Sequence, residues 1–197
     1  MKEEVVLVKE TMKYNPVIVK QTLTVLEAAR LMKHHKIGNV IVVENKKPIG
    51  ILTESDILKK IVAEDKKPGD VLVSAVMSTP VIIIEPYLSI DAAMKIMGKC
   101  NIRRLPVVEK GVLIGIITQR DISRISPVLH EITREWSNIV GRDESYLRSQ
   151  IFSGKCEDCG ILSTNLKTID GRLLCEDCVD ALKYDETPSE NGEKSEE

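Results

Sequence analysis

The chain repeats part of its own sequence after 65 residues, and this repeat limits the folds that it can adopt. GILTESDI, residues 50–57, returns as GIITQRDI, residues 115–122. Thirteen of the thirty-five positions from Leu23 to Ile57 are identical to those from Leu88 to Ile122, without a gap. Self-similarity at a fixed spacing is typical of chains that stack copies of one structural unit. The sequence therefore predicts two copies of the same small unit.

Each copy has the same order of expected elements. A short β-branched strand follows a proline at residues 15–20 and again at 79–84. An amphipathic helix comes next, and Thr24 or Ser89 is expected to be its N-cap. Two strands joined by a polar turn and a second helix complete the unit. The order of elements is therefore β-α-β-β-α in both copies.

These units predict a mixed α/β (α+β) fold. One unit is too small to bury its sheet alone, so we expect the two to pack as a pseudo-twofold pair with a shared core. The first repeat is expected at residues 11–63 and the second at 76–126, with residues 64–75 as the crossover.

The remainder of the chain has a different character. Residues 127–152 are expected to form a helical connector, and residues 153–184 a small ribbon. Residues 185–197 carry six acids and one lysine with almost nothing to bury, so we expect this tail to be disordered. The connector has an apolar stripe, which consists of Leu129, Ile132, Trp136, Ile139 and Val140.

The tandem units resemble a pair of CBS domains, named for cystathionine β-synthase. The resemblance rests on GILTESD and GIITQRD at matching ends and on RLPVV before the second of them, and it covers residues 11–126. It implies a regulatory module that binds adenosine-containing ligands in clefts between the repeats. It also implies a homodimer.

Both repeated corners have the spacing Gly-apolar-apolar-Thr-x-x-Asp. A helix that begins after Thr53 or Thr118 offers free backbone N–H groups, which suit a phosphate. Asp56 and Asp121, one turn later, can accept hydrogen bonds from ribose hydroxyls, and this matches how the family uses these positions. The same spacing is also close to a capping box, in which the acid only closes the helix start. Both interpretations stay open, and they are compatible.

The two predicted nucleotide sites differ in charge. The second copy has Arg120 inside the corner and Arg103 and Arg104 before its middle strand, and arginine suits phosphate oxygens. The first copy has Glu54 and Ser55 where the second has Gln119 and Arg120, and the Glu54 carboxylate would repel a phosphate. We therefore expect the second site to bind phosphate more tightly, although the arginines could also be solvated surface charges.

Four cysteines near the C-terminus form two Cys-x2-Cys pairs. They are Cys156, Cys159, Cys175 and Cys178, and fifteen residues separate the pairs. Two such knuckles complete a tetrahedral thiolate site, and the segment has too few apolar residues to fold without a metal. We expect one structural zinc per chain, with a single iron as the alternative. The segment resembles a zinc-ribbon or rubredoxin-type module.

Composition excludes several classes of function. No apolar run approaches the length of a membrane span, and the N-terminus is a poor signal peptide, which predicts a cytoplasmic protein. The net charge of −2, the 3% aromatic content and the acidic ribbon make nucleic-acid binding an unfavoured interpretation. The sequence has no recognisable nucleophile–base pair or phosphate-binding glycine loop, so we do not expect an enzyme.

Two functions remain. The first is a regulatory sensor that binds an adenine nucleotide, AMP and ATP included, and passes a change of shape to the ribbon or to a protein partner. The second is a rubredoxin-like metal or electron carrier in which the paired repeats are a dimerisation scaffold. The residues do not distinguish AMP from ADP, ATP or S-adenosylmethionine.

Overall fold

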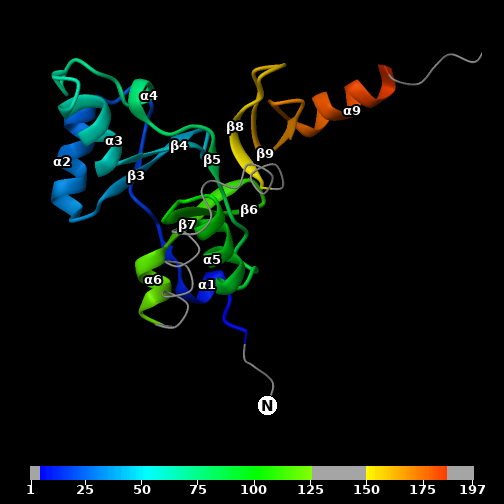
Figure 1. Cartoon of the computed structure of the whole chain (residues 1–197), viewed down its shortest axis with the longest axis horizontal. Helices are drawn as coiled ribbons and strands as arrows, with labels where there is room; N and C mark the ends of the chain where they lie inside the picture. The colour runs from blue at the N-terminus through cyan, green and yellow to red at the C-terminus, as the bar shows by residue number, and fades with distance from the viewer. Residues whose placement is uncertain (1–4, 126–149, 186–197) are drawn as a thin grey trace, which may run out of the picture.

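The computed structural model describes residues 5–125 and 150–185. The chain forms two repeat units and a C-terminal ribbon, which lie side by side in Figure 1. Most of the predicted connector and all of the predicted acidic tail after residue 185 lie outside the described residues. Within the described part of the chain, no helix is both long and apolar enough to cross a membrane.

The first repeat has the predicted order of elements. Parallel β2 (Ile18–Val19) and β3 (Asn39–Glu44) are joined by helix α2 (Val25–His35). β4 (Lys47–Thr53) then pairs with β3 in the antiparallel sense, and α3 (Glu54–Ile57) follows it. The final helix continues as a single π-helical segment, η1 (Leu58–Val62), and a short helix, α4 (Val73–Val76), lies in the crossover.

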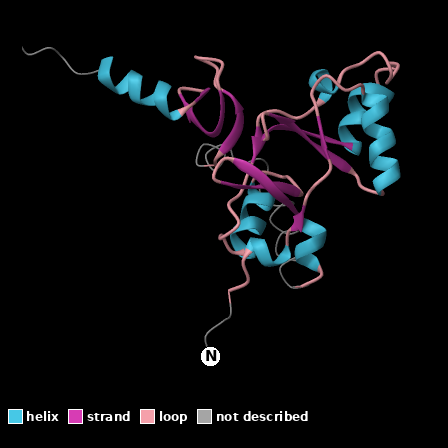
Figure 2. Cartoon of the chain, turned by 180° about the vertical axis from the view of Figure 1, so that it is seen from behind, coloured by secondary structure: helices cyan, strands magenta, loops and turns pink. Residues whose placement is uncertain are grey.

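The second repeat copies the first. It contains β5 (Val81–Ile82), α5 (Ile90–Lys99), β6 (Arg104–Glu109), β7 (Val112–Thr118) and α6 (Gln119–Ser123). Both hairpins shift register at the same place, between Val42 and Val43 in β3 and between Val107 and Val108 in β6. Figure 2 shows the helices and strands of the two units from behind. The predicted mixed α/β fold of paired repeats is confirmed.

Local sequence explains where the long helices begin. Thr24 caps α2, and Glu27 completes a capping box, while the Ser89 hydroxyl accepts the backbone N–H of Ala92 in α5. Val25, Ala28 and Met32 then recur at helical spacing and are buried. Each repeat has its own aliphatic core, one around α2 and one around α5, so among the described residues two separate cores replace the shared core that we expected.

The segments before the two repeats exchange partners, which the sequence did not indicate. After a short helix, α1 (Val8–Thr11), strand β1 (Lys13–Tyr14) pairs with β7 of the second repeat instead of with its own repeat. In the same way, Ser78 forms a bridge with Ile51 of the first repeat. The exchange ties each repeat to the chain segment that leads into the other.

The C-terminal ribbon shares its sheet with one strand of the second repeat. Its strands β8 (Phe152–Lys155), β9 (Leu162–Ile169) and β10 (Arg172–Leu174) are followed by α9 (Glu176–Asp185). The sheet order is β10-β9-β8-β5, so β8 pairs with a strand of the second repeat. Asp170 and Gly171 both have positive φ and form the turn between β9 and β10. Phe152, which was expected in the connector, begins β8.

Candidate functional site

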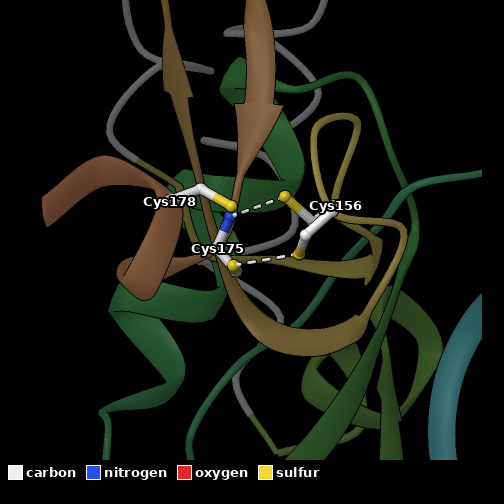
Figure 3. A group of neighbouring side chains, drawn as sticks. Cys156, Cys175 and Cys178 are labelled. Carbon is white, nitrogen blue, oxygen red and sulfur yellow. Dashed lines mark hydrogen bonds between the residues drawn. The ribbon is translucent and has the colours of Figure 1, made fainter. Parts of the chain in front are cut away.

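The ribbon brings together all four predicted cysteines. Cys156 follows β8, Cys175 follows β10, and Cys178 lies in the first turn of α9. Their sulfurs and that of Cys159 all lie within 4.8 Å of one another. Figure 3 shows Cys156, Cys175 and Cys178 approaching from the two knuckles. The cluster is compatible with a metal ion held by four sulfurs.

Backbone hydrogen bonds prepare the first knuckle for a thiolate. Burial disfavours the charged form of Cys156, but the backbone N–H groups of Cys159, Cys175 and Asp158 outweigh it and lower the pKa to about 6. The Cys175 N–H lies 3.3 Å from the Cys156 sulfur. One thiolate therefore forms readily near neutral pH.

Cys175 and Cys178 resist ionisation when no cation is present, because the pKa of each thiol is raised. The pKa of Cys178 is raised, first by its interaction with the Cys159 sulfur and then by burial. The Cys159 and Cys175 sulfurs are only 3.7 Å apart. A second thiolate beside the first is costly unless a cation neutralises both. The donor set, four soft sulfurs around one point, therefore fits zinc or a single iron.

Both repeated corners are capping boxes in the structure. The Thr53 backbone N–H and hydroxyl donate to Asp56 Oδ2 over 3.0 and 2.6 Å, and the Thr53 hydroxyl accepts the Asp56 N–H. Thr118 and Asp121 form the same three bonds. The capping interpretation of these positions is thus what the structure shows.

The second oxygen of each aspartate has a different partner in each repeat. Asp56 Oδ1 lies 3.3 Å from Lys60 Nζ and accepts the Ser78 hydroxyl over 3.2 Å. Asp121 Oδ1 lies 3.2 Å from Lys13 Nζ, which comes from β1. Both carboxylates are engaged in this state, so a ribose that donates both of its hydroxyls to one of them would have to displace an existing contact.

A cleft of about 1050 Å³ lies between the two repeats. Four of the predicted nucleotide residues line it, and they are Arg103, Arg104, Thr118 and Arg120. Thr53, Asp56 and Asp121 lie outside its lining. Three lysines that the sequence analysis missed also line it, and they are Lys13, Lys33 and Lys36.

The missed lysines had weak sequence signals. Lys33 and Lys36 lie at the C-terminal end of α2. Basic residues are common there because they interact favourably with the negative end of the helix dipole. Lys13 reaches the cleft only because β1 pairs with the other repeat. No spacing within one repeat could have indicated that contact.

The three predicted arginines are spread along the cleft. Arg104 is half-buried, and burial lowers the pKa of its guanidinium, as does the positive charge of Arg103. The carboxylates of Glu54 and Asp56 act in the opposite direction, so Arg104 faces the acids of the first repeat. The positive charge that was predicted to gather at the second corner is therefore shared between both repeats.

Comparisons with known proteins identify the repeats. The family model "CBS domain" matches residues 8–63 and 73–127. An uncharacterized protein of Methanocaldococcus jannaschii is 39% identical over 186 residues, which cover 91% of this chain and 95% of that protein. This relative therefore extends over the ribbon as well as the repeats.

Two solved structures have the same fold. A CBS domain pair in complex with 5′-methylthioadenosine and S-adenosyl-L-methionine is 31% identical, with a TM-score of 0.57, and the match covers 62% of this chain and 96% of that one. A CBS domain protein from Thermoplasma acidophilum is 21% identical, with a TM-score of 0.64, and covers 86% of this chain and 92% of its own. With two matched domains in more than half of its length, the chain belongs to the CBS domain family.

Proposed function

We propose that the chain is a regulatory sensor with two ligands. An adenosine-containing nucleotide binds in the cleft between the repeats, and one structural zinc ion binds the four cysteines of the ribbon. In this proposal the protein binds its ligands in the cytoplasm without transforming them, and a change of shape passes to the ribbon or to a protein partner. The single observation that carries it is the cationic cleft at the two repeated corners.

The corners supply the groups that a nucleotide needs. Thr118 and the arginines Arg103, Arg104 and Arg120 line the cleft and can donate to phosphate oxygens. Thr53 belongs to the matching corner, and Asp56 and Asp121 stand beside the cleft as acceptors for ribose hydroxyls. A related CBS pair is known with adenosine-containing ligands, which supports the same ligand class here.

The ribbon supports a structural role for its metal. Cys156 and Cys175 are buried, and they pack with Phe152, Leu166 and Leu174 in a core of five buried residues. So small a core supplies little folding free energy, so the metal must contribute much of it. Zinc suits this role because it has no redox chemistry and accepts tetrahedral sulfur ligands.

One observation favours the second candidate, an electron carrier with a single iron. Cys159 is exposed, and Ile161 beside it is 63% exposed. An exposed sulfur ligand would give a partner protein close access to the metal. The absorption spectrum of the purified protein distinguishes the candidates, because ferric thiolate is coloured and zinc thiolate is not.

We also propose that two chains associate as a homodimer. Leu58 and Val62 lie one turn apart on η1 and are more than 60% exposed, which leaves an apolar helical face for a second copy. Native mass spectrometry of the protein as purified reports metal, nucleotide and number of chains together.

Thermal unfolding with AMP, ATP and S-adenosylmethionine tests the nucleotide site. A ligand at a hundredfold its Kd stabilises the folded state by about 2.7 kcal/mol, which is a measurable rise in Tm. We expect at least one of the three to raise the Tm of the metal-loaded protein. No rise with any of them, together with no bound nucleotide in the mass spectrum, would contradict the proposal.

A further inference from the structure

Lys13 reaches the second corner from outside its repeat. Its strand is fixed against β7 by the pairing of Lys13 with Ile116 and of Tyr14 with Gly115. The Lys13 ammonium then lies 3.2 Å from Asp121 Oδ1. The lysine side chain is 60% exposed, whereas that of Asp121 is only 5% exposed. An exposed cation therefore covers an almost buried carboxylate.

Of the about four acceptor positions of the Asp121 carboxylate, described residues occupy three, so it cannot accept both hydroxyls of a ribose unless the Lys13 ammonium leaves. Oδ2 accepts from the Thr118 backbone N–H and hydroxyl, and those bonds hold the start of α6. Oδ1 is the oxygen that Lys13 occupies. A ribose that donates both of its hydroxyls to this carboxylate must therefore compete with the Lys13 ammonium.

The charges that line the cleft determine where the displaced Lys13 ammonium goes. Among the residues that the structure describes, Lys13 lines the same cleft as five other cations, and Glu54 is the only acid in that lining. The other five are Lys33, Lys36, Arg103, Arg104 and Arg120. With its flexible four-carbon stem, Lys13 can turn from Asp121 to a phosphate in the cleft. An uncharged nucleoside offers it no such replacement.

We propose that Lys13 is the specificity-determining residue that makes the cleft prefer phosphorylated nucleosides to adenosine and to cationic ligands such as S-adenosylmethionine. This inference rests on the proposed nucleotide site. A phosphorylated ligand takes Asp121 with its ribose and gives Lys13 a new anionic partner. Adenosine breaks the Lys13–Asp121 ion pair and leaves the ammonium without a partner. A sulfonium adds a positive charge to a cleft that already holds six.

The first repeat provides a matched reference for this arrangement. Ser78, 65 residues after Lys13, donates its hydroxyl to Asp56 where Lys13 meets Asp121. The Asp56 carboxylate also pairs with Lys60, but Lys60 does not line the cleft, and its Nζ donates to the Val76 carbonyl over 2.6 Å. Lys13→Ser therefore gives the second corner the side chain of the first. Lys60→Ser removes an equal charge from the matching aspartate, but at a position that does not line the cleft.

Titration calorimetry with adenosine and ATP on the metal-loaded, full-length protein tests the inference. For Lys13→Ser we expect ATP to bind about tenfold more weakly, because one charge-assisted contact is lost, while adenosine binds as tightly as before or more tightly. The slope of log Kd for ATP against log salt should also become shallower. Lys13→Arg should retain the preference for ATP, and Lys60→Ser should change the ratio of the two affinities by less than about threefold.

The outcomes separate this inference from the proposed function. If the wild-type protein binds adenosine and ATP but Lys13→Ser weakens both equally, or leaves both unchanged, the role of Lys13 is wrong and the nucleotide site stands. If Lys60→Ser shifts the ratio as strongly as Lys13→Ser, the effect is one of net charge and the inference also fails. If the wild-type protein binds neither ligand, the proposed nucleotide site is itself overturned, and the inference with it.

Discussion

At the scale of single residues, the two Thr-x-x-Asp corners show how one spacing can serve both folding and binding. Thr53 and Thr118 hold their aspartates in the same three hydrogen bonds. The sequence predicted this capping as one of two interpretations, because the spacing of a capping box is local. The partners of the second oxygens, Lys13, Lys60 and Ser78, were not predicted. Two of these three contacts depend on how distant segments pair.

Asp56 should make the stability of the first repeat depend on acid pH. Burial opposes its charge, but the Thr53 hydroxyl and N–H and the Lys60 ammonium together lower the pKa of the carboxyl. A lowered pKa means that the stabilisation is fully present above the ordinary value and is lost as the pH falls through the folded value. We expect Asp56→Asn to be less stable than wild type at neutral pH, and the difference to shrink on acidification.

Urea denaturation of both proteins from pH about 6 to about 3 measures this difference. Glu64→Gln, at an exposed position in the turn after η1, is the control, and its free energy of unfolding should vary with pH as that of wild type does. A stability difference between wild type and Asp56→Asn that stays constant over this range would contradict the assignment.

At the scale of elements, the repeated glycine of the corner motif has a steric cause. A Cβ on Gly115 would meet the Lys13 carbonyl oxygen at 2.9 Å and the Met12 sulfur at 2.7 Å. A Cβ on Gly50 would meet the Met77 sulfur at 2.7 Å in the same way. The glycines let the segment that precedes one repeat cross closely over the hairpin of the other. The sequence predicted the hairpins from their polar turns, but not this crossing, because it joins residues 27 positions apart at Gly50 and 102 positions apart at Gly115.

Gly115→Ala should therefore push β1 away from β7. The contact with a backbone oxygen cannot be relieved by a side-chain rotation, so we expect a loss of about 1–3 kcal/mol in the free energy of unfolding. Because Lys13 is carried by β1, the preference for ATP over adenosine should fall as well.

Denaturant unfolding and titration calorimetry measure the two effects of Gly115→Ala. Gly111→Ala is not a clean control because Gly111 has a positive φ, whereas Gly69→Ala is, because a Cβ there meets its nearest atom, in Leu26, at 3.7 Å. A Gly115→Ala protein with the same free energy of unfolding as wild type would contradict the close contact between Gly115 and β1.

At the scale of the whole molecule, the ribbon is joined to the repeat pair by several kinds of contact. β8 pairs with β5, and the Ser153 hydroxyl donates to the Pro48 carbonyl. Lys47 Nζ donates to the Leu162 carbonyl over 3.1 Å. Composition and cysteine spacing predicted a ribbon as a local module and the gathering of its four cysteines at one point, and their role as metal ligands stays a prediction. They could not indicate that the ribbon docks on the repeats. Neither β5 nor β8 has a sequence pattern that identifies the other as its partner.

Cys156→Ser should abolish metal binding and unfold the ribbon. Because β8 is the partner of β5, we expect the amides of Val81 and Ile82 to lose protection as well as those of β8, β9 and β10. The sheet of the first repeat, β2-β3-β4, should remain protected. Metal analysis and hydrogen exchange of the variant measure both effects.

Cys100→Ala is the control for that variant, because Cys100 is buried in the core around α5 and lies outside the cluster. It should keep one metal per chain even if the second repeat becomes less stable. A Cys156→Ser protein that retains its metal, or one whose β5 stays fully protected, would contradict this account of the ribbon.

The pairing of β8 with β5 also bears on how the protein stays dispersed at high concentration. Without β8, the outer edge of β5 would present unpaired backbone groups beside Ile82, whose side chain now packs against the ribbon core. An open strand edge with apolar neighbours is a template on which another chain can add, and many proteins cover such edges to avoid aggregation. The ribbon therefore also covers that edge, and in our proposal a metal bound to its four cysteines holds it in place. In a cell that lacks the metal, the protein would then expose this strand edge and aggregate. Solubility would be lost before ligand sensing.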